Sequence, residues 1–232
     1  MWNFKRYISV VAVVFAITLT ASGAVINKAY TDKRNQISVV VDAGHGSPDG
    51  GAVGVSNTQE KDINLAIAKK LCEVLEGKGI KVIMTRDSDS GIWDSSAQTI
   101  REKKVSDMNN RLKIMKESKA DLFLSIHMNS FSNSSAKGLR VFYDKNHPEG
   151  EEIAKNIQES ICEITGAQGQ AVKTADTKLF LMKNPPMPAI LIECGFISNA
   201  NEEKRLKNDE YQSEIAWAIA ESVEKSYETL TN

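Results

Sequence analysis

The sequence contains little cysteine: three residues in a chain of 232, and no two of them lie at a Cys-x-x-Cys spacing. An odd number of cysteines cannot all pair within one chain, which argues against a disulfide framework. The missing Cys-x-x-Cys spacing likewise argues against a small structural zinc loop or a dithiol redox motif. Cys72 and Cys162 fall on the apolar faces of expected helices, where cysteine behaves as a small buried hydrophobe.

The chain also lacks an excess of either charge. Its 29 basic and 30 acidic residues nearly cancel, so no surface built to neutralise nucleic-acid phosphates is expected, and nucleic acid is excluded as a partner. Internal repeats and low-complexity segments are absent as well. A composition of 41% hydrophobic and 25% charged residues is typical of a globular protein. These features together predict one packed domain.

One long uncharged run interrupts this composition, and it lies at the N-terminus. Lys5 and Arg6 precede residues 7–26, which carry no charge and are rich in Val, Ala and Ile. The pattern is typical of an export signal, so we expect 1–28 to be either a cleaved signal peptide or a retained membrane anchor. A buried core helix is a third interpretation, but such a helix usually carries polar residues on its outer face. Because basic residues stay on the cytoplasmic side, the chain beyond a linker at 29–36 is expected to face outward.

Beyond the linker, apolar runs and helical patterns alternate, which predicts a single α/β domain over 37–230. Continuous β-branched and apolar runs predict buried strands at 37–41, 80–84, 122–126, 139–143 and 189–192. Apolar residues at helical spacing predict helices at 60–78, 108–117, 153–164, 202–207 and from 211 onward. Residues 87–107 are expected to form a polar excursion, and 176–184 a hairpin-like or irregular segment. We therefore expect a twisted, largely parallel sheet flanked by helices on both faces.

Four ionisable side chains follow the ends of these strands or begin the helix after one. His45 lies in a glycine-rich loop after the first strand, and Glu60 begins the helix that follows. His127 and Glu193 come directly after two later strands. Because the loops at the carboxyl ends of parallel strands share one edge of the sheet, we expect all four side chains to meet there.

Two imidazoles and one carboxylate form the ligand set of catalytic zinc in many hydrolases, with a further position open to water. We therefore predict that His45, Glu60 and His127 hold one zinc ion. Glu193 is then free to act as general base and general acid. Simpler interpretations exist: a hydrogen-bonded core histidine for His127, a carboxylate at a helix N-terminus for Glu60, and the partner of a buried base for Glu193. The third histidine, His147, is expected at the surface.

Four segments resemble the zinc-dependent N-acetylmuramoyl-L-alanine amidases of the Amidase_3 family. They are Asp42-Ala43-Gly44-His45-Gly46, Glu60, Ser125-Ile126-His127-Met128-Asn129 and the PAILIECGFISN stretch at 188–199. Their order and spacing make the resemblance specific, and it covers the chain from about residue 39 to 227. It implies a zinc-exopeptidase-like fold, with the zinc ligands and the acid/base residue as predicted above. It also implies cleavage of the amide bond between N-acetylmuramic acid and L-alanine in peptidoglycan.

A lone catalytic domain behind an N-terminal hydrophobic segment is most similar to the CwlD-type branch of this family. That resemblance implies a role in spore cortex maturation toward muramic-δ-lactam, and hence in germination. It also implies a location in the forespore/mother-cell intermembrane space or the cell wall. Because no cell-wall-binding repeats are present, targeting is expected to depend on the membrane segment or on an envelope or membrane-anchored accessory protein.

Other candidate site residues depend on weaker patterns. Many relatives have an arginine where this chain has Lys183, so the substrate contact expected there would be weaker or monodentate. Asn129 and the basic stretch of Arg101, Lys103 and Lys104 are further candidates for contacts with glycan or stem-peptide carboxylates. Asp42 is a candidate hydrogen-bond partner that fixes the tautomer of an imidazole ligand.

Two other functions fit parts of the sequence. Cys194 and His127 are the residue types of a cysteine amidohydrolase, although the neighbouring Glu193 opposes thiolate formation. A non-catalytic envelope scaffold would retain the fold and the metal ligands but would have no need of Glu193. Three ligands on separate loops also leave room for weak zinc binding in the isolated chain and for help from a partner protein.

Overall fold

The computed structural model describes residues 37–226 and residue 230. The expected signal peptide or anchor at 1–28 and the linker at 29–36 lie outside the described residues. Within the part of the chain that is described, no helix is both long enough and apolar enough to cross a membrane.

A six-stranded sheet forms the centre of the domain. Its strands are β1 (Ser38–Ala43), β2 (Lys81–Met84), β3 (Leu122–Asn129), β4 (Arg140–Tyr143), β5 (Lys173–Thr174) and β6 (Ala189–Phe196). The strand order is β2-β1-β3-β6-β4-β5, and β2, β1, β3 and β6 all run parallel. β4 runs antiparallel to β6, and β5 is parallel to β4. The expectation of a largely parallel sheet is confirmed, with two reversed strands at one side.

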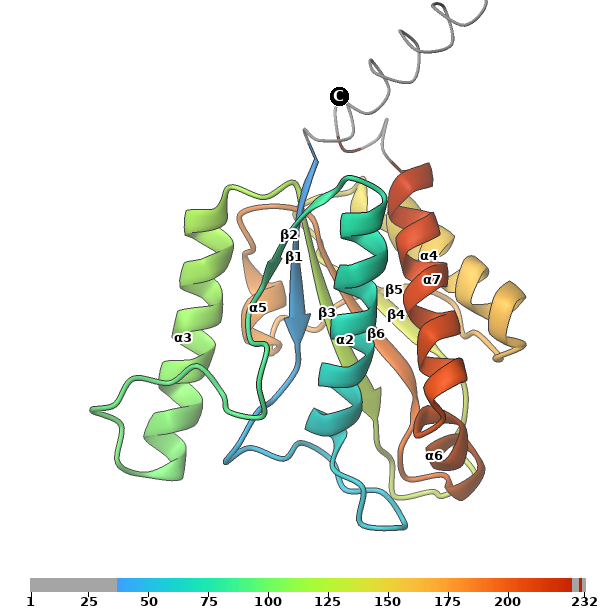
Figure 1. The fold of residues 1–232 in the computed structure, drawn as a ribbon, viewed down its shortest axis with the longest axis horizontal. Coiled ribbons are helices and arrows are strands. Elements are labelled where there is room, and N and C mark those ends of the chain that lie inside the picture. Colours follow the sequence, from blue (N-terminus) through green and yellow to red (C-terminus); the bar gives the residue numbers. More distant parts are fainter. Residues whose placement is uncertain (1–36, 227–229, 231–232) are drawn as a thin grey trace, which may run out of the picture.

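Helices cover both faces of the sheet (Figure 1). They are α2 (Glu60–Gly77), α3 (Ile100–Ser118), α4 (Gly150–Thr165), α5 (Phe180–Lys183), α6 (Ala200–Leu206) and α7 (Asp209–Lys225). α2, α4 and α7 lie against one face, whereas α3 and α5 lie against the other. The single α/β domain with helices on both faces is confirmed.

Two segments differ from expectation. α3 begins at Ile100 rather than near residue 108, because Thr99 and Glu102 form a capping box in which each side chain accepts a hydrogen bond from the other's amide. The charged stretch at the start of α3 carries no apolar period, so its sequence pattern does not predict the first turns. The expected irregular segment at 176–184 contains the short helix α5.

The larger core lies between the sheet and α2, α4 and α7. In α2, the side chains of Ile63, Ile67, Leu71 and Leu75 are buried at helical spacing. Burial of apolar area is the main stabilising contribution to a fold, so this side supplies most of the stability. We call the whole apolar cluster between the sheet and these three helices the large core.

Alternation along the strands decides which residues face α3 and α5, because successive side chains point to opposite faces. On β3, Ile126 belongs to the large core, so His127 faces the α3 side. On β6, Ile192 and Cys194 belong to the large core, so Glu193 also faces the α3 side. His127 and Glu193 are direct neighbours in the register of the two strands. The sheet thus places both residues on the face opposite the large core.

Candidate metal centre

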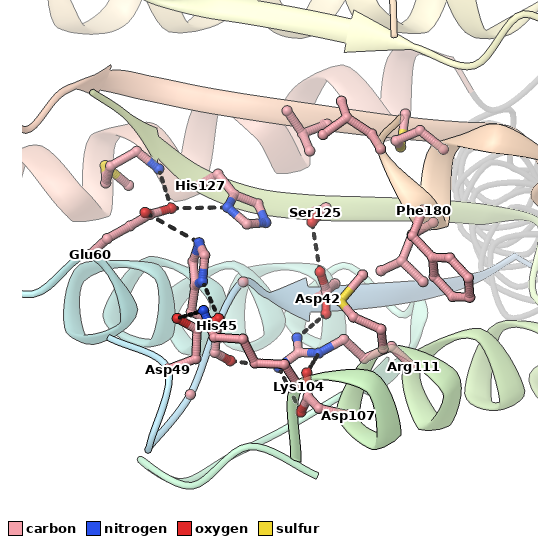
Figure 2. Close-up of a pocket in the computed structure, with 18 of the residues that line it drawn as sticks. Asp42, His45, Asp49, Glu60, Lys104, Asp107, Arg111, Ser125, His127 and Phe180 are labelled. Atoms are coloured by element: carbon pink, nitrogen blue, oxygen red, sulfur yellow. Dashed lines mark hydrogen bonds and ion pairs between the residues drawn. The ribbon is translucent and has the colours of Figure 1, made fainter. Parts of the chain in front are cut away.

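Three of the four predicted side chains converge near the carboxyl ends of β1 and β3, with His127 still inside β3 (Figure 2). One ligand atom from each of His45, Glu60 and His127 lies within 4.8 Å of the other two. Glu60 Oε2 is 3.2 Å from His45 Nε2, and Glu60 Oε1 is 2.9 Å from His127 Nδ1. The two imidazole rings are inclined at 75°, with their centroids 5.0 Å apart. Two nitrogens and a carboxylate therefore surround one small space.

Two glycines make room for this cluster. A Cβ on Gly44 would lie 2.3 Å from His127 Nε2, so the imidazole fills the space that any other residue would need. A Cβ on Gly51 would lie 2.6 Å from Glu60 Oε2 and 2.7 Å from His45 Cδ2. His45 itself has a φ of +61°, a conformation uncommon for a residue with a side chain. The local backbone is shaped to bring the three side chains together.

The cluster attracts positive charge. Burial raises the pKa of Glu60, but hydrogen bonds from His127 and His45 outweigh burial and hold this pKa well below its ordinary value. Burial lowers the pKa of His45, whereas hydrogen bonds to Asp49 and Glu60 outweigh it and raise the pKa to about 9. Groups that stabilise a cationic imidazole also stabilise a divalent cation that replaces the proton. Imidazole nitrogens with a carboxylate oxygen are a donor set that zinc favours, so the residues fit this metal.

Asp49 is a site residue that the sequence patterns did not predict. Its Oδ2 lies 3.1 Å from His45 Nδ1, and its Oδ1 lies 2.9 Å from Lys104 Nζ. A carboxylate at Nδ1 holds the proton there and leaves Nε2, the nitrogen that faces Glu60, as the free ligand. The available signal was the position of this carboxylate, four residues after His45 in the same glycine-rich loop.

The structure corrects the prediction for Asp42, because Asp49 and not Asp42 hydrogen-bonds an imidazole. The buried carboxylate of Asp42 accepts hydrogen bonds from Thr85 at 2.7 Å, from Ser125 at 2.6 Å and from Arg111. It supports the site through Arg111 rather than by fixing a tautomer.

Two buried arginines hold the loop that carries His45. Arg111 on α3 donates to the main-chain oxygen of His45 and forms ion pairs with Asp42 and Asp107. Arg86 donates to the main-chain oxygens of the two residues before His45, at 2.8 and 3.0 Å. Hydrogen bonds to charged donors are stronger than neutral ones, so this network fixes the strained loop firmly. Neither arginine was predicted, because each lies in a polar segment and the main-chain oxygens of this loop that it holds are more than 40 positions away in the sequence.

Glu193 lies beside the cluster, one strand away from His127. Burial raises its pKa, the charges of His127, His45 and Arg140 lower it, and that of Glu60 raises it, so the pKa is about 7. Its Oε2 is buried and has no hydrogen-bond partner among the described residues. A carboxyl group with a pKa near neutrality can accept and release a proton with equal ease.

A cavity of about 380 Å³ adjoins the cluster. The metal-binding side chains and Glu193 line one part of it, and Trp93, Lys103 and Lys104 line another. Another part of the wall is apolar and comes from α3, the strands, α5 and the residue before it, with Met108, Phe123, Leu179, Phe180, Leu181, Met182 and Leu191. Polar side chains of Asp42, Asp107, Arg111 and Ser125 also line the cavity. Charged and apolar groups that converge in one cleft are typical of a small-molecule site.

Of the candidate substrate residues, Lys103 and Lys104 line this cavity, whereas Arg101, Lys183 and Asn129 do not. Arg101 is exposed on α3 and lines a separate shallow groove with Thr99 and Glu102. Lys183 is exposed at the end of α5, and Asn129 ends β3. The basic residues that do line the cavity come later in the same charged stretch of α3.

Cys194 lies on the wrong face of the sheet for a nucleophile. It is 1% exposed and packs in the large core, whereas His127 faces α3. Burial, together with the charges of Glu193 and Glu60, raises the pKa of the thiol well above its ordinary value. The cysteine amidohydrolase interpretation is therefore wrong.

Comparisons with known proteins agree with this geometry. The profile described as N-acetylmuramoyl-L-alanine amidase, Amidase_3, matches residues 39–225. The chain is 34% identical over 188 residues to the germination-specific N-acetylmuramoyl-L-alanine amidase of Bacillus subtilis, covering 80% of this chain and 77% of that protein. It is similar to the amidase AmiA of Escherichia coli, at 29% identity over 80% of this chain and 74% of that protein. The structure of the CwlD amidase from Clostridioides difficile, in complex with the GerS lipoprotein, matches with a TM-score of 0.79 and 40% identity over 84% of this chain and 99% of that chain.

Proposed function

The chain belongs to the N-acetylmuramoyl-L-alanine amidase family Amidase_3, and from that premise we propose a zinc-dependent enzyme that acts on spore cortex peptidoglycan. Peptidoglycan amidase activity follows from the family. The proposal adds the metal, the roles of individual residues and the cortex as substrate.

One observation carries the proposal: the convergence of His45, Glu60 and His127 within 4.8 Å, beside the buried carboxyl group of Glu193. We assign the first three as zinc ligands and Glu193 as the residue that moves protons. Two glycines that admit no side chain and a strained histidine support this assignment, because such costly local geometry is typical of functional sites.

Zinc held by these ligands would supply Lewis-acid chemistry, which polarises the carbonyl of the lactyl amide and lowers the pKa of a water molecule. Glu193 takes one proton from the attacking water as the water oxygen bonds to the carbonyl carbon. The bond between the carbonyl carbon and the alanine nitrogen then breaks, and Glu193 delivers the proton to this nitrogen. A pKa of about 7 suits both transfers. Asp49 and Arg111 keep His45 in place throughout.

The cortex assignment is supported by two relatives: the germination-specific amidase of Bacillus subtilis and the CwlD amidase. With it we propose that the product leads to muramic-δ-lactam formation. We also propose that residues 1–28 export or anchor the catalytic domain at 37–230, which would then work outside the cytoplasmic membrane.

An accessory protein is part of the proposal. The CwlD neighbour is in complex with a lipoprotein, and a membrane-anchored partner of this kind would hold the catalytic domain near its substrate. A partner that binds the zinc-loaded state preferentially would raise zinc occupancy by linkage. Zinc content measured alone and with the partner tests this; full occupancy of the isolated protein would remove the need for help.

Digestion of purified cortex and vegetative peptidoglycan, followed by mass spectrometry of the released fragments, tests the reaction. We expect intact stem peptides that begin with a free alanine amine, from cortex in preference to vegetative wall, and loss of this release after EDTA. Activity that survives chelation would contradict the role of zinc. Glu193→Ala should abolish the cell-wall phenotype of the wild-type protein; an unchanged phenotype would support a non-catalytic scaffold instead.

A further inference from the structure

Arg140 lies next to Glu193 on the neighbouring strand. In the antiparallel pairing of β4 with β6, Arg140 is directly opposite Glu193, so both side chains project from the same face of the sheet. On the other side of Glu193, His127 is its neighbour in β3. The three residues form a row across three strands, which we call the catalytic row.

The guanidinium group of Arg140 packs on an aromatic ring at the edge of this row. A register shift between β3 and β6 pairs Asn129 with Phe196 and so brings Phe196 onto the face of His127 and Glu193. The guanidinium carbon of Arg140 lies 5.2 Å from the centre of the Phe196 ring. Stacking orients a guanidinium group through its face, and the donors of its two terminal nitrogens stay available.

Arg140 forms no ion pair and no side-chain hydrogen bond in the part of the chain that the structure describes; the carboxyl group that its charge acts on is that of Glu193, whose pKa it lowers. Its Nε is buried and without a hydrogen-bond acceptor there, and its side chain takes part in none of the described ion pairs. The buried Arg86 and Arg111 differ, because their guanidinium groups donate to main-chain oxygens and carboxylates. A buried donor without an acceptor is unfavourable, and a ligand that supplies one removes this penalty.

We propose that Arg140 binds a carboxylate on the peptide side of the scissile amide. This inference rests on the proposed function, in which Glu193 delivers a proton to the leaving nitrogen. The peptide that leaves must therefore begin beside Glu193. Arg140 lies on the side of Glu193 away from His127 and the metal-binding cluster, beyond the residues that line the cavity. A peptide that extends from Glu193 away from the metal would bring its first free carboxylates to this guanidinium group. Arginine pairs with carboxylates through two parallel hydrogen bonds, which makes this contact a specificity determinant.

Two synthetic substrates test the assignment. One is N-acetylmuramoyl-L-alanyl-D-glutamate, and the other is the same compound with both glutamate carboxyl groups converted to amides. We expect the wild-type protein to cleave the acid with a KM lower by about 10- to 100-fold, the size of a hydrogen bond to a charged group. Arg140→Gln should abolish this difference by raising only the KM of the acid, while Arg140→Lys should retain part of it. The KM of the diamide should stay the same in all three proteins; KM rather than kcat is the readout, because the charge of Arg140 lowers the pKa of Glu193.

Arg205→Gln is the matched control, because Arg205 also packs on an aromatic ring, 4.3 Å from the centre of Tyr211, but lies outside the catalytic row. Melting temperature and zinc content verify that each variant is folded. The inference is overturned if wild-type protein does not distinguish the two compounds, or if Arg140→Gln changes both KM values equally. If wild-type protein releases no peptide from these compounds or from purified peptidoglycan, the proposed function itself fails.

Discussion

The two faces of the sheet are stabilised by different interactions. On one face, α2, α4 and α7 bury a large and nearly continuous apolar core. On the other face, the apolar cluster is smaller, and Arg111 and Met115 are the buried residues of α3. There, buried ion pairs and hydrogen bonds connect α3 to the ends of the strands, as between Arg111 and Asp42.

The metal-binding cluster and Glu193 lie toward the face with less apolar packing, and this location has a physical reason. Apolar burial is non-directional, so it stabilises a scaffold without fixing one loop conformation. Hydrogen bonds to charged groups are directional and can hold a strained residue such as His45 in place. A face that admits substrate also cannot be closed by tightly packed helices. Stability and function are thus largely separated between the two sides of one sheet.

Glu193→Gln should lower the activity more than the other substitutions do and should leave the stability of the fold unchanged. The substitution keeps the size of the side chain but removes its ability to accept a proton, so we expect kcat to fall about 10²- to 10⁴-fold. Zinc content and melting temperature should stay unchanged, because Glu193 is not among the three converging ligands. Peptide release and metal analysis measure these quantities, with Glu73→Gln on the exposed side of α2 as control. Loss of zinc in the Glu193 variant would show that its role was assigned wrongly.

Arg111→Met tests the polar side directly. It leaves the buried carboxylate of Asp42 without its cation, and we expect the free energy of unfolding to fall by about 3–5 kcal/mol. Zinc affinity should fall as well, because the main-chain oxygen of His45 loses its donor. Urea unfolding and zinc titration measure the two effects. In the double variant with Asp42→Asn, part of the lost stability should return; strictly additive losses would contradict the coupling.

Leu71→Ala tests the apolar side. Leu71 is fully buried in the large core, so the truncation should lower the free energy of unfolding by about 2–5 kcal/mol. KM and zinc affinity of the folded fraction should not change. Met108→Ala, on the half-buried cavity wall, should show the reverse pattern, with a smaller loss of stability and a raised KM. Equal effects of the two variants on KM would show that the faces are not separate.

The same contrast explains what the sequence predicts. The strands and α2 carry apolar runs or a clear 3.6-residue period, and the edge rule for parallel strands brought together His45, Glu60 and His127 as expected. The polar side lacks such a signal. A buried Arg111 in a charged helix has the same local pattern as a solvated one, and its partner Asp42 lies 69 positions away. Contacts of this kind depend on the assembled fold, which is why Asp42 was given the role that Asp49 has.

Asp49→Asn tests how much the carboxylate behind His45 contributes to zinc binding. The amide can still contact Nδ1, but it removes the negative charge that strengthens the imidazole as a ligand. We expect zinc affinity to fall about 10- to 100-fold, with kcat of the fully loaded enzyme less affected. Competition with a chelator of known affinity measures the change. Asp89→Asn is a suitable control, because Asp89 is an exposed carboxylate that pairs with Lys61. An equal loss of zinc affinity in the Asp89 variant would mean that surface charge, and not the contact with His45, causes the effect.

The effect of pH has opposite signs for folding and for metal binding. In the metal-free protein, the pKa of His45 is raised from 6.5 to about 9 by Asp49 and Glu60, against the effect of burial. Its stabilising contribution is therefore complete below pH 6.5 and is lost as the pH rises through 9. Zinc must displace the same proton, so zinc affinity should increase over this window by up to about tenfold per pH unit. Thermal melts with EDTA and zinc titrations between pH 6.5 and 9 measure the two trends.

Asp49→Asn should make both the stability and the zinc affinity depend less on pH, because the substitution lowers the pKa of His45. A zinc affinity that does not change with pH would mean that zinc displaces no proton from His45.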